Sequence, residues 1–169
     1  TLAAHLLGRT RRMRVGTAVT ILPTHSPVAV AEQAAVLDHV SGGRFDLGIG
    51  RGGPVVDYEA LGRSLEDWRS GLAGAVEVVL RSFTGKVSAE SELHRFREVA
   101  PAPRPRTVPH PPVYLAASSE RNVDLAARHD LPLLFFLLQD PQAISPLVER
   151  HAAATGRPAP GALHPYWQQ

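Results

Sequence analysis

A short apolar segment bounded by glycines constrains the fold of this chain more than any other feature. The run Leu37–Gly52 reads LDHVSGGRFDLGIGRG. It ends a helix in a glycine turn, continues as a strand over residues 45–49, and leaves that strand at the glycine-flanked Arg51. An arginine at the carboxyl end of a buried strand presents a planar fork to an anion, and neighbouring glycines let the backbone come close to it. The segment therefore indicates an α/β fold with an anion site at the end of a strand.

Strand-like and helix-like segments alternate along the rest of the chain. Near-continuous apolar runs suit strands that are buried on both faces of a parallel sheet, and apolar residues at helical spacing suit helices that cover it. Proline after a capping residue marks helix starts, and glycine marks helix ends. The expected strands cover residues 14–22, 45–49, 113–117 and 133–138. The expected helices cover residues 2–7, 27–41, 68–83 and 122–128, and a last helix opens at Asp140-Pro141 or Ser145-Pro146 and closes at Gly156. Residues 86–112 are rich in proline and are expected to be irregular.

This order of elements predicts an α/β chain with about four parallel strands. With 169 residues the chain is long enough for one domain with a core, so we expect a single domain over residues 1–169 with an irregular tail over 157–169. Periodicity does not choose between an open doubly wound sheet and a barrel. The absence of a GxGxxG motif after the first strand counts weakly against a dinucleotide-binding fold.

Composition excludes several classes of function. The chain has no cysteine, which excludes disulfides, thiolate metal sites and a cysteine nucleophile. Its eight histidines form no HxH or HExxH pattern, so we expect no metal. The net charge of +2 does not call for a nucleic acid, and no apolar run reaches membrane-spanning length. We therefore expect a cytoplasmic protein without a nucleic-acid or membrane partner.

Four segments in the right order resemble the bacterial luciferase-like flavin- or deazaflavin-dependent monooxygenase family. They are LDHVSGGRFDLGIGRG, TRRMRVGTAVTILPTHSP over residues 10–27, FREVAPAPRPRTVPHPP over 96–112, and VYLAASSERNVDLAARHDLPLL over 113–134. The family fold is a (β/α)8 barrel whose active site lies at the carboxyl ends of the strands. The resemblance implies a partial TIM-barrel-like fold that covers the third to sixth β/α units, with FMN or a deazaflavin as cofactor.

The resemblance also implies a set of site residues. Arg51 matches the phosphate-contacting arginine of the family, and a non-proline cis peptide under the flavin ring falls at Ala18–Val19. Gly50 belongs to the same expected cofactor-contacting set. Further phosphate-binding groups fall at the end of the third expected strand and the start of its helix, where helix N–H groups favour an anion. These groups are Ser118, Ser119 and Asn122. His25 follows the first strand on the expected active-site side and is a candidate proton donor or acceptor.

Structural roles are open for several of these residues. Arg51 is also suited to capping a strand end or pairing with Asp57 or Glu59, and His25 to a plain surface position. Ser118 and Ser119 also suit an N-cap pair. Arg44 is expected to form a structural salt bridge with Asp38 or Asp46, and Trp68 and Phe83 are expected in a helix face of the core.

The leading functional hypothesis is an oxidoreductase or monooxygenase of the luciferase-like class acting on a small organic substrate. A half-barrel of apolar strands exposes its inner face and two edges, so we expect a homodimer, a complementing chain, or a remodelled fold that covers them. One alternative is a shortened family member that has lost flavin catalysis and acts as a cofactor-independent enzyme or as a binding or partner subunit. Another is a fragment of a longer member.

Overall fold

The computed structural model of this protein describes residues 1–53, 55–135 and 139–157, and of residues 55–57 it describes only the backbone. The chain divides into two compact units, which comprise residues 1–112 and 113–169. The expected single domain stays a prediction, and the expected tail lies outside the described residues from residue 158 onward.

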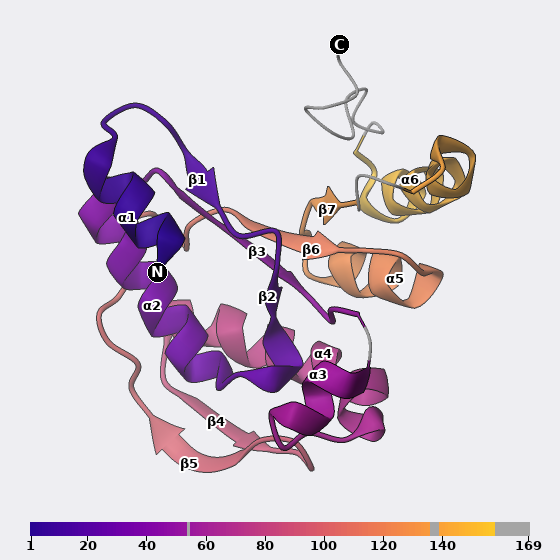
Figure 1. Cartoon of the computed structure of the whole chain (residues 1–169), viewed down its shortest axis with the longest axis horizontal. Helices are drawn as coiled ribbons and strands as arrows, with labels where there is room; N and C mark the ends of the chain where they lie inside the picture. Colours follow the sequence, from indigo (N-terminus) through magenta and orange to yellow (C-terminus); the bar gives the residue numbers. More distant parts are fainter. Residues whose placement is uncertain (54, 136–138, 158–169) are drawn as a thin grey trace. The chain divides into compact units, whose positions relative to one another are not determined.

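In the first unit, three short strands form parallel pairs and helices run beside them (Figure 1). Strands β1 (Val15–Gly16) and β2 (Thr20–Ile21) both pair with β3 (Phe45–Gly50). Helix α1 (Leu2–Arg9) precedes β1, and helix α2 (Pro27–Ser41) connects β2 to β3 after the short helix η1 (Leu22–Thr24). Helix α3 (Val55–Ala60) and helix α4 (Leu65–Thr84) follow β3. The α/β order with parallel strands is thus confirmed.

The ends of helix α2 lie where the sequence predicts them. The Ser26 hydroxyl accepts a hydrogen bond from the backbone N–H of Ala29, and Pro27 occupies the first helical position. At the other end Gly42 adopts a left-handed backbone with φ of 69°. Its N–H donates to the carbonyl groups of the last turn, which a helix otherwise leaves without partners.

The first expected strand is not continuous. Residues 17–19 interrupt it and separate β1 from β2. The Thr17 hydroxyl donates to the Gly48 carbonyl over 2.8 Å and accepts from the Gly48 N–H over 3.0 Å, so a side chain replaces part of the backbone ladder here. Apolar periodicity cannot reveal such an exchange, because it depends on a residue 31 positions away.

The proline-rich segment was expected to be irregular, and this is wrong for its first part. Strands β4 (Val87–Glu90) and β5 (Arg95–Val99) form an antiparallel hairpin. The remainder, up to residue 112, is held by side-chain contacts. The buried carboxylate of Asp38 accepts hydrogen bonds from the N–H and the hydroxyl of Thr107 at 2.6 and 2.8 Å. The ring of Phe83 lies 5.6 Å from that of His110, so Phe83 is part of the core as expected.

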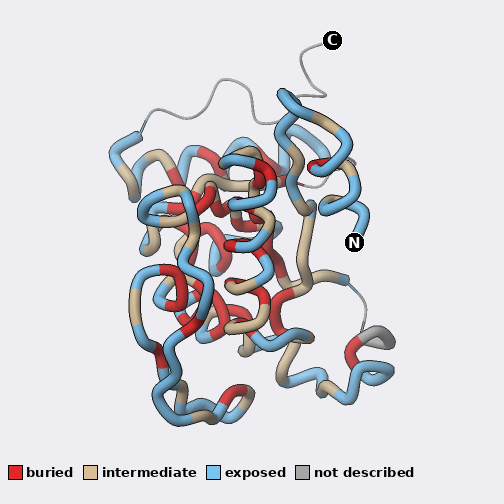
Figure 2. Tube along the Cα trace, turned by 90° about the vertical axis from the view of Figure 1, so that its left-hand side faces the viewer, coloured by how far each residue is buried: buried red, intermediate tan, exposed pale blue. Residues whose placement is uncertain are grey.

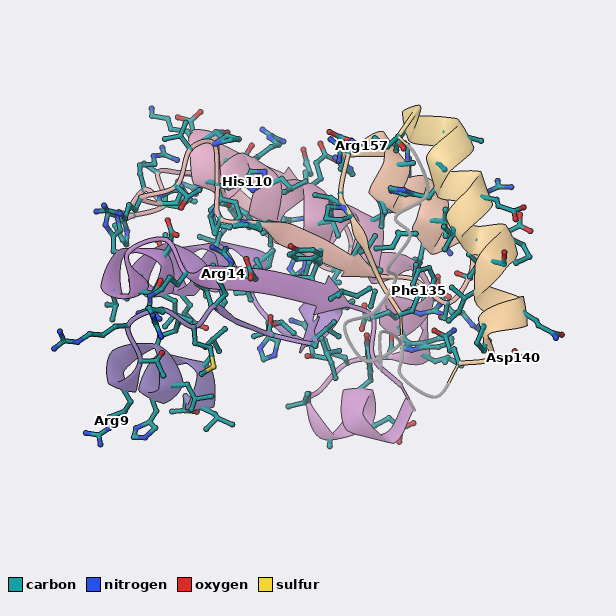
Figure 3. The ribbon with its side chains drawn as sticks, turned by 90° about the horizontal axis from the view of Figure 1, so that it is seen from above. Arg9, Arg14, His110, Phe135, Asp140 and Arg157 are labelled. Atoms are coloured by element: carbon teal, nitrogen blue, oxygen red, sulfur yellow. The ribbon has the colours of Figure 1, made fainter. Side chains whose placement is uncertain are left out.

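Arg44 does not form the expected ion pair. Among the described residues its guanidinium donates instead to the carbonyl oxygens of Leu7, Thr10 and Met13. These oxygens lie at and just beyond the C-terminal end of α1, where backbone acceptors lack helical partners. Asp46 pairs with Arg14, whose nearest nitrogen lies 2.5 Å from the carboxylate (Figure 3).

The second unit contains parallel strands β6 (Val113–Ala116) and β7 (Leu133–Leu134), with helix α5 (Glu120–Arg128) between them and helix α6 (Pro141–Thr155) after them. Helices α5 and α6 pack side by side (Figure 1). Asp140 caps α6, so the first of the two expected starts is correct, and Pro146 lies inside the helix. The expected strand over 133–138 is described only as far as residue 135. Buried residues gather inside the units (Figure 2), among them most of β3 and alternate positions of β6. In the second unit a cluster forms around Val123, Phe135 and Ile144.

Candidate functional site

Strands β2 and β3 end at the same level, and this brings several predicted residues to one edge of the first unit. Their parallel register pairs Thr20 with Ile49 and Ile21 with Gly50. Beyond this pair, β2 passes into η1 and β3 passes into Arg51. The carboxyl edge of parallel strands is the usual place for a ligand in α/β folds.

Arg51 is half-buried at this edge and lies against an aromatic ring. Its guanidinium carbon is 3.9 Å from the ring centroid of Trp68, in the first turn of α4. Within the described side chains the guanidinium of Arg51 forms no ion pair, and so the expected alternative with Glu59 is not found. The side chain of Asp57, the other alternative, lies outside the description. Arg51 is therefore a cation whose electrostatic partner within the described chain is an aromatic face.

Two aromatic side chains hold the backbone on either side of this arginine. The Tyr58 hydroxyl donates to the Arg51 carbonyl over 2.6 Å, and the Trp68 indole N–H donates to the Gly52 carbonyl over 3.3 Å. Tyr58 is fully buried, and this burial raises the pKa of its hydroxyl to about 12. The group is therefore protonated, and able to donate, at every pH at which a protein of this kind is handled.

Glycine is required at position 52 for two independent reasons. Its φ of +74° lies in the left-handed region. A Cβ atom at this position would also come within 2.8 Å of the Cδ1 atom of Ile21, so the chain after β3 crosses directly against the end of β2. The sequence predicted that the glycines here let the backbone come close to an anion, whereas the close neighbour of Gly52 in the structure is the side chain of Ile21.

Ala18 and Val19 lie in the interruption between β1 and β2, in the same unit as Arg51 and Gly50. The Ala18–Val19 peptide bond is cis, as the family resemblance implied. His25 is exposed and follows η1, where its N–H donates to the carbonyl of Leu22. No contact of the His25 ring distinguishes a catalytic role from a surface role, so its role stays a prediction.

The other predicted phosphate-binding residues lie together at the start of α5, in the second unit. Ser119 occupies the N-cap position but makes no side-chain capping bond, and its carbonyl accepts from the N–H groups of Asn122 and Val123. Ser118 is exposed, and Asn122 is buried with its amide 3.5 Å from the carbonyl of Ala116. Ser119 thus occupies the N-cap position that the structural alternative gives it, and its phosphate-binding role stays a prediction.

The hairpin tip adds residues that the sequence did not single out. The side chain of Leu93 packs against Gly71 of α4, where a Cβ atom would come within 2.5 Å of its Cδ2 atom and 3.4 Å of Pro23. His94 is next to it, and its Nε2 atom is buried without a hydrogen-bond partner among the described residues. Burial lowers the pKa of His94, the positive charge of Arg63 lowers it further, and Asp67 acts in the opposite direction. No motif marks this histidine, because its burial depends on packing between distant segments.

A surface groove of about 600 Å³ lies elsewhere in the first unit. Side chains of α1 and α2 line it, among them Ala4, Val36 and Leu37. None of the predicted site residues lines this groove.

Two features are absent from the described residues. No helix there combines the length and the hydropathy that a membrane crossing requires. No three histidine, aspartate or glutamate side chains there are grouped so that they would hold a metal ion. The expected absence of a metal stays a prediction.

Comparison with known proteins identifies relatives over most of the chain. Residues 1–165 match the family model described as luciferase-like monooxygenase. The alkanal monooxygenase alpha chain of the Kryptophanaron alfredi symbiont is 35% identical over 133 residues, which are 78% of this chain and 37% of that protein. The monooxygenase RslO1 from Streptomyces bottropensis has a TM-score of 0.85 and 28% identity, over 91% of this chain and 48% of that one.

Two more distant structures share the fold. One is the oxygenating constituent of 3,6-diketocamphane monooxygenase from a Pseudomonas putida plasmid, in complex with FMN, with a TM-score of 0.75 and 15% identity over 91% of this chain and 46% of that one. The other is the coenzyme F420 dependent tetrahydromethanopterin reductase from Methanopyrus kandleri, with a TM-score of 0.71 and 20% identity over 92% of this chain and 50% of that one. The neighbours of this fold thus include both flavin and deazaflavin proteins.

These matches confirm the expected fold class, an α/β chain of parallel strands and helices that corresponds to part of a luciferase-like barrel. The chain spans about 37% of the alkanal monooxygenase alpha chain and about half of the solved structures. The match over residues 1–165 shows that this chain belongs to the luciferase-like monooxygenase family.

Proposed function

We propose that this chain is a flavin- or deazaflavin-dependent oxidoreductase, of the monooxygenase type, that acts on a small organic substrate. Family membership supports the class of reaction. The observation that carries the assignment is the environment of Arg51, a cation at the carboxyl end of β3 that forms no ion pair with a described side chain. A cation kept without a carboxylate partner at a ligand-binding edge is suited to an anionic ligand.

The donor set of the chain fits a cofactor phosphate. The guanidinium of Arg51 offers a fork of N–H groups that matches phosphate geometry. The start of α5 offers backbone N–H groups, the favourable end of the helix dipole, and a Ser119 hydroxyl that makes no capping bond. We propose that Arg51 of the first unit binds the cofactor phosphate, with Gly50 and the Ala18–Val19 segment of that unit against the ring system. We propose that Ser118, Ser119 and Asn122 of the second unit are phosphate-binding groups.

Each side chain then has a limited task. The cofactor ring supplies the redox chemistry when it is bound. Arg51 binds and orients the phosphate, the Thr17–Leu22 segment shapes the pocket beside the ring, and His25 holds or moves a proton at its imidazole. A reactive flavin site has to exclude water, and we propose that a second copy of the chain or a complementing chain provides this cover. We propose that this takes place in the cytoplasm.

A visible absorption spectrum of the purified protein tests the class of cofactor. Bound flavin or deazaflavin near one per chain is the expected result. Colourless protein that also binds neither added FMN nor added deazaflavin would refute the proposal. It would favour instead a family member without flavin catalysis.

Removal of the Arg51 charge tests the phosphate contact. We expect Arg51→Ala to weaken FMN binding by about 1.5–3 kcal/mol, the usual value of a hydrogen bond to a charged group, and to leave riboflavin binding unchanged. Isothermal titration calorimetry with both ligands measures the difference. Arg97→Ala, which removes an exposed arginine on β5, is the matched control and is expected to alter neither affinity. Equal FMN affinity in the parent and in Arg51→Ala would contradict the assignment.

A further inference from the structure

Trp68 contacts both the side chain of Arg51 and the backbone of the next residue, Gly52. The ring faces the guanidinium at 3.9 Å, while the indole N–H donates to the Gly52 carbonyl over 3.3 Å. The sequence predicted a helix-face core role for this residue, but the structure places it half-buried at the start of α4. It is therefore not a core residue in the sense of Phe83, which is 3% exposed.

The local structure of α4 fixes the position of Trp68. Ser64 and Asp67 form a capping box: the Ser64 hydroxyl accepts from the Asp67 N–H, and the Asp67 carboxylate accepts from the Ser64 N–H over 2.7 Å. The helix therefore has a defined first turn, and Trp68 lies in this turn. An aromatic side chain with two rotatable bonds, fixed by its indole hydrogen bond, is a rigid support.

Contact with the ring leaves the hydrogen-bonding edge of the guanidinium available. A cation–π contact uses the face of the guanidinium or its charge, whereas phosphate is recognised through N–H groups in the guanidinium plane. An arginine side chain otherwise loses rotamer entropy when a ligand orders it. A support that orders the guanidinium before the ligand arrives lowers that cost of binding.

The backbone of Arg51 is ordered by the same neighbourhood. The hydroxyl of the buried Tyr58 donates to its carbonyl over 2.6 Å, and Gly52 crosses against Ile21. Two successive carbonyl groups are thus held by aromatic side chains from two successive helices, α3 and α4. Only the long side chain of Arg51 remains to be positioned, and Trp68 is the side chain in contact with it.

We infer that Trp68 is a positioning residue, which holds the guanidinium of Arg51 in place for a phosphate monoester such as that of FMN. This inference rests on the proposed function. It goes beyond family membership, since it concerns a contact between side chains of this chain. It predicts that loss of the ring weakens recognition of the phosphate and leaves recognition of the flavin ring system intact.

Binding measurements with FMN and riboflavin test the inference, because the two ligands differ only in the phosphate. We expect Trp68→Leu to weaken FMN binding about fivefold, the size of a partly exposed cation–π contact, without change for riboflavin. Trp68→Phe retains an aromatic face and is expected to recover most of the FMN affinity. In an Arg51→Ala background, Trp68→Leu is expected to have no further effect on FMN. Equal losses for FMN and riboflavin, or additive effects of the two substitutions, would overturn the inference.

Two outcomes separate the inference from the proposed function. If Arg51→Ala weakens FMN binding but Trp68→Leu does not, Arg51 binds phosphate without this support, and only the inference fails. If the parent protein does not distinguish FMN from riboflavin, both fail. A spectroscopic measurement needs no cofactor: with Trp167→Phe, Trp68 is the single tryptophan, and its fluorescence is expected to change on Arg51→Ala. Unchanged emission would show that the two side chains are not in contact and would overturn the inference.

Discussion

At the scale of single residues, the partners of three charged side chains in the first unit distinguish structural residues from a candidate ligand-binding residue. Arg44 donates to carbonyl oxygens at the end of α1, and the carboxylate of Asp38 accepts from Thr107. Both use their hydrogen-bonding groups within the fold. Arg51 contacts an aromatic face and keeps its N–H edge for another acceptor. The sequence indicated that Arg51 was special through its flanking glycines, but it did not reveal Trp68 or Tyr58, which contact it through packing between helices.

His94 makes the stability of the protein depend on pH. Burial lowers its pKa below the ordinary 6.5, and the unfolded chain therefore binds this proton at a higher pH than the folded chain does. The free energy of unfolding is expected to be highest above about pH 6.5 and to fall as the pH is lowered further. His94→Leu removes the titration and also a buried nitrogen that has no hydrogen-bond partner among the described residues. We therefore expect this variant to lose less stability than the parent between about pH 7 and about pH 5.5.

Urea denaturation at the two pH values measures this effect. His5→Gln is the control, because His5 is exposed on α1 and its replacement is expected to leave the pH dependence of the parent unchanged. A His94→Leu protein that loses as much stability as the parent on acidification would show that this imidazole does not carry the effect.

At the scale of secondary-structure elements, the sequence predicts what is decided locally. The ends of α2, α4 and α6 depend on capping residues and glycines that are adjacent in the chain, and their expected positions are correct to within a few residues. Two elements depend instead on distant residues. The first strand is interrupted because Thr17 bonds to Gly48, and the β4–β5 hairpin is anchored where Leu93 meets Gly71. Periodicity and proline content hold no information about such contacts, so these features were not predicted.

Two glycines allow a direct test of whether local backbone conformation decides these features. Gly42 ends α2 with φ of +69°, whereas Gly74 is an exposed residue inside α4, and a Cβ atom would meet no atom within 4 Å at either position. Substitution by alanine is therefore a test of backbone conformation alone. We expect Gly42→Ala to destabilise the protein by about 1–2 kcal/mol, and Gly74→Ala to stabilise it by about 0.5–1 kcal/mol. Midpoints of urea denaturation measure both changes, and effects of the same sign would show that local conformation does not control these positions.

At the scale of the whole molecule, the strand edges bear on whether the chain associates with another chain. In the described part of the first unit, β1 and β2 pair with β3 alone, and their other edge meets no strand. The related structures contain about twice as many residues as this chain matches, since it covers 48% of the RslO1 monooxygenase. Apolar strands with an open edge and an uncovered face favour association with another chain.

We therefore expect the protein to fold only as an assembly, either of two copies or with a complementing chain. When the purified chain is diluted, association and folded structure are expected to be lost together, because the surface that a partner covers would otherwise be exposed to water. Sedimentation velocity and far-UV circular dichroism across the same dilution series measure the two properties. Helical signal that persists in a species with the mass of one chain would show that the chain folds alone.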